Sequence, residues 1–372
     1  MKTKYIFILG IIISFFLSAC NSKDDLGVMT HFAYQETQNG KWGIMGINGE
    51  IVVPPTFQGM PTPVSDGMFF VPRQDDTYEL HSMEDPQKII DANYTKVTNF
   101  SEGKAFVVRE GENISCIDKN GDILFQLPPN ITVAFSFING LAPIQRDDNL
   151  MGYIDSEGKN VIPFQYILGT HFLEEYAVAV FENDRENIYV IDKKGNKITR
   201  INGDVQEETQ STIGANISIW DYGIFNGVVP YVANGSDFGL KNVNGEIILP
   251  ASSQYKTISR SWGGYCIYQT EQGCGIMDDS GKILIKDKYS LISSCNINNN
   301  KIFIACIDKK WGILSMDEKQ LCPFEYDYII GIFNSSKFVA VRDKKFFLIT
   351  KTGEIERRFN NINMVLNAVV EK

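Results

Sequence analysis

Apolar and polar residues alternate in short runs along most of this 372-residue chain, and the same runs return at a regular distance. Segments such as Leu141–Ile144 and Met151–Asp155 have the period of two that is typical of a half-buried β-strand. No stretch keeps a sustained helical period. The pattern therefore predicts an all-β protein with three to four short strands in each repeat unit.

One glycine marks the same point in successive repeats. The marker positions are Gly49, Gly121, Gly158, Gly195, Gly245, Gly281, Glu318 (in place of glycine) and Gly353. Most intervals lie near about 36 residues, and the first interval is twice as long. A weakened copy is therefore expected near residue 85, where Tyr78–Ser82 and Lys88–Ile90 keep the pattern. About nine units fill residues 31–372, which predicts a tandem array of β-repeats.

The chemistry around the marker glycine is that of a hairpin turn. Stretches such as Asp118–Gly121 and Asp192–Gly195 have the form Asp-x-x-Gly. Glycine takes the positive φ that such a turn needs, and the aspartate bonds the local backbone. Proline follows in the next strand, as at Pro54 and Pro163. We expect it to end that strand, because proline cannot donate to a ladder.

The full unit has the form Lys-Trp-Gly-Tyr-Ile-Asp…Gly…Val-Ile-Pro…Tyr, and over residues 31–372 it resembles the WG-repeat family. Only Trp42-Gly43 and Trp311-Gly312 keep the Trp-Gly pair, whereas Gly152, Gly239 and Gly275 keep the glycine alone. The Trp position otherwise holds Tyr78, Ile114, Met151, Ile188, Phe238, Cys274 and Phe346. Because Ile and Met replace Trp, the position is predicted to pack in the core. The glycine beside it is expected to let a neighbouring backbone or ring come close.

A single repeat of this kind cannot bury its own apolar face, so neighbouring repeats must stack. A propeller-like ring and an open β-superhelix both satisfy this requirement. The C-terminal segment Met364–Val370 repeats part of the strand pattern. It could pair with the first repeat near Phe32–Tyr34, or it could form a terminal cap.

The first 19 residues have the features of an export signal rather than of a folded element. Lys2 and Lys4 precede the apolar run Tyr5–Leu17, which is shorter than the roughly 20 residues of a membrane-spanning helix. Leu17-Ser18-Ala19-Cys20 resembles the bacterial lipobox. The resemblance implies that Cys20 carries diacylglycerol and a further acyl chain such as palmitate, and that residues 20–30 are a tether. A plain secretory signal with an incidental cysteine is the alternative.

The residues after this cysteine carry a further resemblance. Lys23-Asp24-Asp25 is similar to the surface-export signal of Bacteroidetes lipoproteins. This similarity implies an outer-membrane lipoprotein that faces outward. A short solvated tether would have the same composition, and it is the other interpretation.

One interval breaks the repeat. Gly195 and Gly245 are about 14 residues further apart than the period allows, and the extra residues lie within about 200–221. They are mostly polar, and the segment ends near Trp220. Insertions in repeat arrays are often on the binding face, although a surface loop of this length is also tolerated without any function.

The remaining cysteines are Cys116, Cys266, Cys274, Cys295, Cys306 and Cys322. Cys266 and Cys274 flank a predicted turn, and an exported protein could join them by a disulfide. We favour free, buried thiols that pack as small apolar side chains. None of the spacings suggests a zinc site.

Composition narrows the function classes. With 45 acidic and 35 basic residues the chain has a net charge of −10, which disfavours binding to nucleic acid. We find no paired-His motif, P-loop or Gly-x-Ser-x-Gly, so no cofactor, metal or catalytic residue is predicted. Acid pairs such as Asp147-Asp148 and Asp278-Asp279 are usually solvated turn residues.

These observations predict a binding or scaffold module for a protein or glycan partner. It would be held at the membrane by its lipid anchor, and it would not be an enzyme. The alternatives are a glycan-acting hydrolase that uses paired carboxylates and an accessory lipoprotein of envelope assembly.

Overall fold

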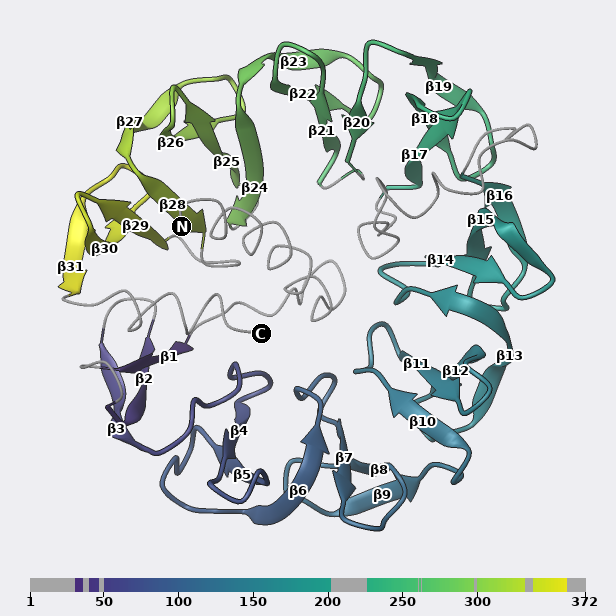
Figure 1. Cartoon of the computed structure of the whole chain (residues 1–372), viewed down its shortest axis with the longest axis vertical. Helices are drawn as coiled ribbons and strands as arrows, with labels where there is room; N and C mark the ends of the chain where they lie inside the picture. Colours follow the sequence, from purple (N-terminus) through teal and green to yellow (C-terminus); the bar gives the residue numbers. More distant parts are fainter. Residues whose placement is uncertain are drawn as a thin grey trace. The chain divides into compact units, whose positions relative to one another are not determined.

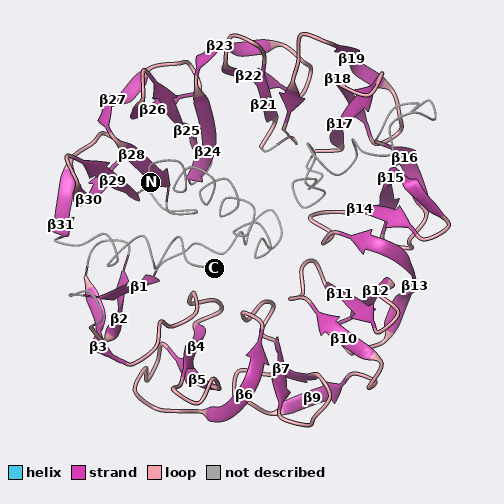
Figure 2. Cartoon of the chain, viewed as in Figure 1, coloured by secondary structure: helices cyan, strands magenta, loops and turns pink. Residues whose placement is uncertain are grey.

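The computed structural model describes residues 31–35, 40–46, 50–201, 226–259, 261, 263–297, 300–331 and 337–359. Every regular element in these residues is a β-strand, which confirms the all-β prediction (Figures 1 and 2). Within the described residues, no helix has the length and apolar character needed to cross a membrane. The chain divides into two compact units, residues 1–142, 156–158 and 325–372 in one and residues 143–155 and 159–324 in the other.

The strands follow one another at short intervals. The first sixteen are β1 (His31–Gln35), β2 (Trp42–Gly46), β3 (Ile51–Phe57), β4 (Met68–Pro72), β5 (Tyr78–Ser82), β6 (Asp91–Val97), β7 (Ala105–Arg109), β8 (Ser115–Ile117), β9 (Ile123–Gln126), β10 (Ile131–Ala134), β11 (Leu141–Arg146), β12 (Met151–Asp155), β13 (Asn160–Gly169), β14 (Tyr176–Phe181), β15 (Asp184–Asp192) and β16 (Lys197–Arg200). The others are β17 (Val228–Ala233), β18 (Asp237–Asn242), β19 (Ile247–Ser252), β20 (Thr257–Ile258), β21 (Tyr265–Gln269), β22 (Cys274–Asp278), β23 (Ile283–Tyr289), β24 (Leu291–Ile297), β25 (Asn300–Ile307), β26 (Lys310–Ser315), β27 (Gln320–Tyr326), β28 (Tyr328–Gly331), β29 (Lys337–Arg342), β30 (Lys345–Thr350) and β31 (Ile355–Phe359).

The described strands form antiparallel sheets in which sequence neighbours are always hydrogen-bonded neighbours. These sheets are β1–β3, β4–β9, β10–β16, β17–β19, β20–β23, β24–β27 and β28–β31. Nine central strands carry or directly follow the Trp position, namely β2, β5, β8, β12, β15, β18, β22, β26 and β30. The predicted repeats are therefore present, and the weakened copy at Tyr78–Ser82 is β5. Four-stranded antiparallel sheets of this kind are the blades of propeller-like folds.

Repeats of about 36 residues build four-stranded sheets because the outer strand of each repeat is shared. In β13, Ile162 pairs with Tyr153 of β12, and further along Gly169 pairs with Ala179 of β14. Similarly, β24 begins two residues after the end of β23, and β28 two residues after the end of β27. In these repeats the outer strand thus completes its own repeat, and the chain then supplies the first strand of the next.

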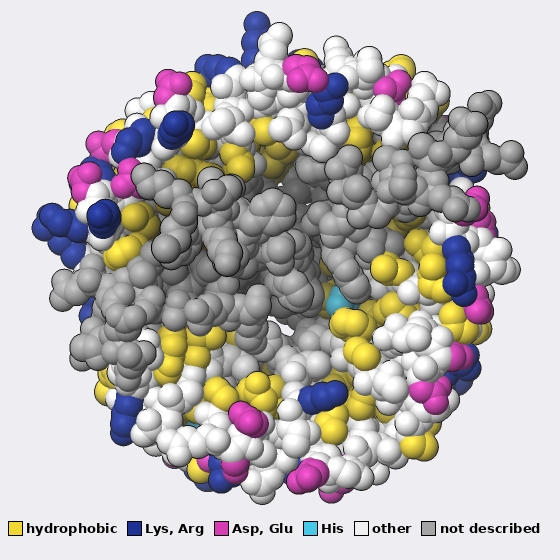
Figure 3. Space-filling model, viewed as in Figure 1, with side chains coloured by type: hydrophobic (Ala, Val, Ile, Leu, Met, Phe, Trp, Pro, Cys, Tyr) yellow, Lys and Arg dark blue, Asp and Glu magenta, His cyan; other side chains and the backbone are white. Residues whose placement is uncertain are grey.

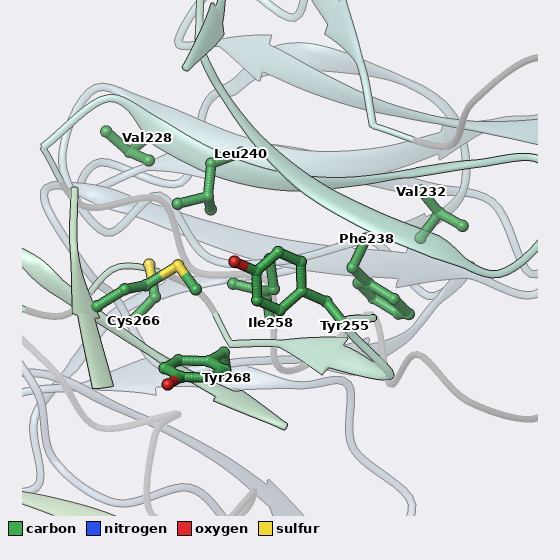
Figure 4. Close-up of a cluster of buried hydrophobic side chains, with 9 residues drawn as sticks. Val228, Val232, Phe238, Leu240, Tyr255, Ile258, Cys266 and Tyr268 are labelled. Atoms are coloured by element: carbon green, nitrogen blue, oxygen red, sulfur yellow. The ribbon is translucent and has the colours of Figure 1, made fainter. Parts of the chain in front are cut away.

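The core lies between successive sheets, as stacking of repeats requires. Figure 4 shows one such cluster, in which side chains of β17 and β18 pack against those of β20, β21 and β22. Its members are Val228, Val232, Phe238, Leu240, Tyr255, Ile258, Cys266, Tyr268 and Met277. Residues at the Trp position are buried in most repeats, including Trp42, and Trp311 is half-buried. The packing interpretation of this position agrees with their burial.

The expected role of proline is wrong. Pro54 lies inside β3 and Pro163 inside β13, and both strands continue beyond the proline. Each proline lies where the outer strand bulges away from its partner, so its missing N–H interrupts no ladder bond.

Cys116, Cys266, Cys274, Cys306 and Cys322 are free and buried, which confirms the favoured interpretation for these five. The side chain of Cys295 lies outside the described residues. The disulfide alternative is wrong, since Cys266 pairs across the hairpin with Met277, and Cys274 with Gln269. Burial and, secondarily, the charge of Asp279 raise the pKa of Cys266, so its thiol stays protonated and unreactive.

Candidate functional site

The glycines beside the Trp position have a packing role. A Cβ atom on any of them would lie 2.5–2.9 Å from a carbonyl oxygen of the outer strand. The pairs are Gly43 with Val53, Gly152 with Ile162, Gly239 with Leu249, Gly275 with Ile285 and Gly312 with Cys322. In three repeats an aromatic ring also comes within 2.7 Å, from Tyr34, Tyr231 or Tyr268. Backbone and ring therefore both approach closely, as expected from the sequence.

This close approach permits a bulge. Around Gly152, Met151 pairs with Tyr166 and Tyr153 pairs with Ile162. The outer strand therefore advances by four residues where the central strand advances by two, so it holds two extra residues here. The same two extra residues occur opposite Gly43 and Gly275. Three repeats have Ser115, Tyr189 or Phe347 in place of this glycine, and their outer strands pair at this point without extra residues. The repeat with Glu79 in this place has one extra residue in its outer strand.

The marker glycines of the hairpin turns have φ between 80° and 88°, as the turn chemistry predicts. They are Gly121, Gly158, Gly195, Gly245 and Gly281. The aspartate that begins the turn, or Asn242 in the turn of Gly245, accepts backbone N–H groups, for example from Lys194 and Asn196 to Asp192. Glu318 takes the same conformation with φ of 62°.

In three repeats a tyrosine near the end of the outer strand joins the repeat to the next. The hydroxyl of Tyr166 donates to the carbonyl of Gly195 at 3.0 Å, and that of Tyr326 to the carbonyl of Gly353 at 3.3 Å. Where glycine is lost, the hydroxyl of Tyr289 donates instead to the carboxylate of Glu318 at 3.1 Å. These tyrosines thus hold neighbouring repeats together.

The fifth repeat departs from this pattern. Tyr189 of β15 occupies the place of the glycine, and its hydroxyl donates to Asp184 at 2.7 Å. Asn187 and Lys197 also donate to this carboxylate, at 2.6 Å and 2.9 Å, and Arg200 donates to the amide oxygen of Asn187 at 3.4 Å. We call these five residues the Asp184 network.

Two aromatic rings flank the cation of this network. The Nζ atom of Lys197 lies 4.0 Å from the ring centre of Tyr189 and 4.5 Å from that of Phe181. A cation held over ring faces gains electrostatic stabilisation that an ion pair alone lacks. Side chains of Asp184 and Lys197 are 24% and 38% exposed, so both can be reached from solvent.

The network changes the acidity of its members. Hydrogen bonds from Lys197, Tyr189 and Asn187, in that order of importance, lower the pKa of Asp184 to about 2. Burial and the hydrogen bond to Asp184 raise the pKa of Tyr189. The carboxylate is therefore ionised and the phenol protonated throughout the neutral range.

Asp184 should contribute to stability in a pH-dependent way. Its pKa is lower in the folded state than the value of about 3.9 in an unfolded chain, so its contribution is complete above that value and is lost as the pH falls towards 2. In urea titrations, Asp184→Asn should lower the unfolding midpoint at pH 6, and the deficit should shrink between pH 4 and pH 3. Glu110→Gln, at an exposed glutamate, serves as the control. A deficit that is constant over this range would contradict the assignment.

Asp147 and Asp148 lie in a turn, and Asp278 ends β22 with Asp279 in the turn that follows. The backbone N–H of Leu150 and the guanidinium of Arg146 hold Asp148 and lower its pKa. Asp279 accepts hydrogen bonds from Ser261 and Asn226. Among the described residues there is no group of three or more His, Cys, Asp or Glu side chains suited to a metal ion.

Sequence reasoning missed a second recurring feature, an arginine at the end of an inner strand. Arg109 stacks on Tyr94, its guanidinium carbon 4.8 Å from the ring centre, and bonds to Asp91 at 2.5 Å. Arg146 and Arg342 stack in the same way on Phe164 and Tyr326. The sequence signal for this feature was the recurrence of arginine at the same position of several repeats. Tyr189 could also have been identified from the sequence, because it replaces the glycine that follows the Trp position, which here holds Ile188.

Several predicted residues lie outside the described part. These are Cys20, Lys23, Asp24, Asp25, Gly49, Met364–Val370 and the segment 202–221 of the insertion.

On the face drawn in Figure 3, acidic and basic side chains of the described part are interspersed rather than gathered by sign.

Part of the repeats matches a known protein family. Residues 42–78, 84–112 and 151–183 match the family model of the WG containing repeat, which supports a WG-repeat family for this chain. No curated protein matches.

Among solved structures, the crystal structure of a eukaryotic initiation factor is similar in fold, with a TM-score of 0.52, 9% identity and coverage of 89% of this chain and 96% of that chain. BamB from Moraxella catarrhalis gives a TM-score of 0.42 at 13% identity, covering 77% and 88%. The computationally designed protein Ika8 gives 0.41 at 12%, covering 77% and 94%. Such identities are informative about fold alone.

Proposed function

We propose that this β-rich protein with WG repeats is a binding or scaffold module, and that the Asp184 network marks the surface that contacts its partner. The observation that carries the proposal is what one of the four repeats without the packing glycine has in its place. At Tyr189 a packing glycine is replaced by a tyrosine that joins an accessible network of charges. Local departures from a consistent repeat are where functional sites are expected.

The charge of this segment indicates what kind of partner it suits. Residues 184–200 contain five basic and three acidic side chains, whereas the whole chain has a net charge of −10. The basic residues are Arg185, Lys193, Lys194, Lys197 and Arg200. Complementary charge favours encounter with a partner that carries acidic groups, on a protein or on a glycan.

A hydrolase of glycans is the less favoured function. Such an enzyme needs a carboxylic acid whose pKa is raised so that it can protonate the leaving group. Within the described part, every carboxyl group with a shifted pKa has it lowered. These groups are Asp75, Asp148, Asp184, Asp192, Glu271, Asp278 and Asp317.

The lipobox resemblance supports the location that we propose. A lipidated Cys20 would anchor the module in the outer membrane, and Lys23-Asp24-Asp25 would direct it to the outer face. Two or more acyl chains are sufficient for stable anchoring. The array would then present its surface to partners in or around the envelope.

Crosslinking in cells with the tagged full-length protein tests the function. We expect a defined partner to co-purify with the wild type, and Lys197→Met to reduce its recovery at least fivefold. Cys20→Ala should leave the membrane fraction. Arg109→Met is the matched control, because it also removes a cation that is stacked on a ring and paired with an aspartate. Equal recovery with both variants would reject the Asp184 network as the contact surface, and absence of any partner would reject the scaffold role.

A further inference from the structure

One lysine occupies a position that other repeats use for the core. This position lies on the central strand, three residues after the Trp position. In seven of the nine repeats it holds an isoleucine, leucine or methionine that is at most 1% exposed, namely Met45, Ile117, Ile154, Ile191, Met277, Leu314 and Ile349. The two exceptions are His81, which is also buried, and Lys241 of β18, which is half-buried. A lysine placed where a repeat normally buries an aliphatic side chain is a local departure of the kind found at functional sites.

The contacts of the Lys241 ammonium lack a negative charge. Its Nζ atom donates to the backbone carbonyl oxygen of Arg200 and lies 5.2 Å from the ring centre of Tyr231. Within the described part these contacts include no carboxylate, whereas the ammonium of Lys197 is paired with Asp184. The charged group that acts on Lys241 is instead the guanidinium of Arg200, which has the same sign.

These surroundings disfavour the charged form of the amine. Burial and, secondarily, the positive charge of Arg200 lower the pKa of Lys241. The uncharged amine has the lone pair that attacks a carbonyl carbon. Desolvation and an adjacent cation are the two ways in which proteins activate lysines that form Schiff bases.

We propose that Lys241 is a reactive amine that condenses with small aldehydes. The Nζ atom forms a bond to the carbonyl carbon, and the carbonyl oxygen leaves as water with the two protons of the neutral amine, so that an imine remains. The guanidinium of Arg200 favours an aldehyde that carries an acid group, because it can pair with the anion. This reactivity does not depend on the proposed scaffold function, since it needs no macromolecular partner.

A purely structural role is the alternative for Lys241. A lysine stem is long enough to carry the ammonium out of an apolar position, and the bond to the carbonyl of Arg200 would then only connect β16 with β18. Such a lysine is charged at neutral pH and reacts no faster than an exposed one. The two roles therefore differ in the rate of reaction at neutral pH and in its pH dependence.

Reductive alkylation of the purified full-length protein distinguishes these roles. Glyoxylate is the aldehyde, sodium cyanoborohydride traps the imine, and peptide mass spectrometry gives the rate at each lysine. Lys288 is the matched control, since it also lies over a tyrosine ring, at 5.4 Å, but is paired with Glu318 at 2.8 Å and has a side chain that is 55% exposed. At pH 7 we expect Lys241 to react about fivefold faster than Lys288, although Lys288 is easier to reach.

The pH dependence adds a second criterion. Near pH 10.4 about half of an ordinary lysine is uncharged, so the advantage of Lys241 over Lys288 should disappear there. A rate at Lys241 that is no higher than at Lys288 at pH 7, or a ratio that is the same at both pH values, would leave Lys241 with a structural role only.

Arg200→Gln tests the contribution of the neighbouring cation. Its removal favours the ammonium form, so Lys241 should react more slowly at pH 7 while the rate at Lys288 stays the same. The loss should be larger with glyoxylate than with acetaldehyde, which has no acid group. An unchanged rate at Lys241 would refute activation by Arg200, and equal losses with the two aldehydes would refute the preference for an acid group.

Discussion

Replacement of Gly275 by alanine should destabilise the protein by about 3 kcal/mol, the upper part of the range for overpacking a core. An added Cβ would lie 2.5 Å from the carbonyl oxygen of Ile285 and 2.5 Å from Cζ of Tyr268. The oxygen belongs to a bulged outer strand that is fixed by pairs on both sides, so it cannot withdraw without breaking them. Urea denaturation followed by tryptophan fluorescence gives the change in unfolding free energy.

Gly235→Ala is the matched control for this effect. Gly235 has φ of 75°, and nothing lies within 4 Å of the position of an added Cβ. Its replacement carries only the cost of a left-handed backbone, about 1–2 kcal/mol. If Gly275→Ala is no more damaging than Gly235→Ala, the close approach of the two strands is not what requires glycine.

This rule explains why the repeats were so readable in the sequence. Glycine occupies this place where the outer strand bulges by two residues over the central one, and Gly43 and Gly152 reveal that requirement without any structure. The residue at the Trp position needs only to be apolar, so it varies between repeats. Turn glycines such as Gly195 were equally predictable, because a positive φ restricts the residue directly.

Features that depend on pairing between distant residues were not predictable. Pro54 reads as the end of a strand, yet it lies in a bulge, and only the register of β2 against β3 reveals this. The double use of outer strands such as β13 is hidden as well, since one continuous apolar pattern serves two sheets.

The Asp184 network was hidden for a related reason. Its five members are spread over residues 184–200, and each is an ordinary polar residue of a strand or turn. Regular pairing of Tyr189 with Arg200, and of Val190 with Thr199, brings them onto neighbouring strands. That pairing accompanies the lost glycine, because β15 and β16 pair at Tyr189 without the two-residue bulge of the glycine repeats. The replacement of the repeat's glycine by Tyr189 thus creates the candidate site.

Replacement of Tyr166 by alanine should cost about 4 kcal/mol, as expected for removal of a large buried aromatic side chain. Tyr166 is fully buried, and its ring packs edge-on against Tyr153 and Phe181 at 6.0 Å and 4.8 Å between ring centres. Tyr166→Phe keeps the ring and loses two hydrogen bonds, the one donated to Gly195 and the one accepted from Nε2 of Gln165, so it should cost about 2 kcal/mol. Equal losses in the two variants would show that the hydrogen bond, and not the ring, joins the repeats.

A double-mutant cycle distinguishes this contact from general loss of packing. A Cβ at Gly195 would lie 2.7 Å from the hydroxyl oxygen of Tyr166, so part of the cost of Gly195→Ala comes from this clash. In the Tyr166→Ala background the clash is gone, and Gly195→Ala should cost less there by about 1 kcal/mol, within the range for residues in contact. Gly245 is the next marker glycine after Gly195, and Gly245→Ala should be additive with Tyr166→Ala. Additivity at Gly195 as well would mean that the two residues do not form the joint between their repeats.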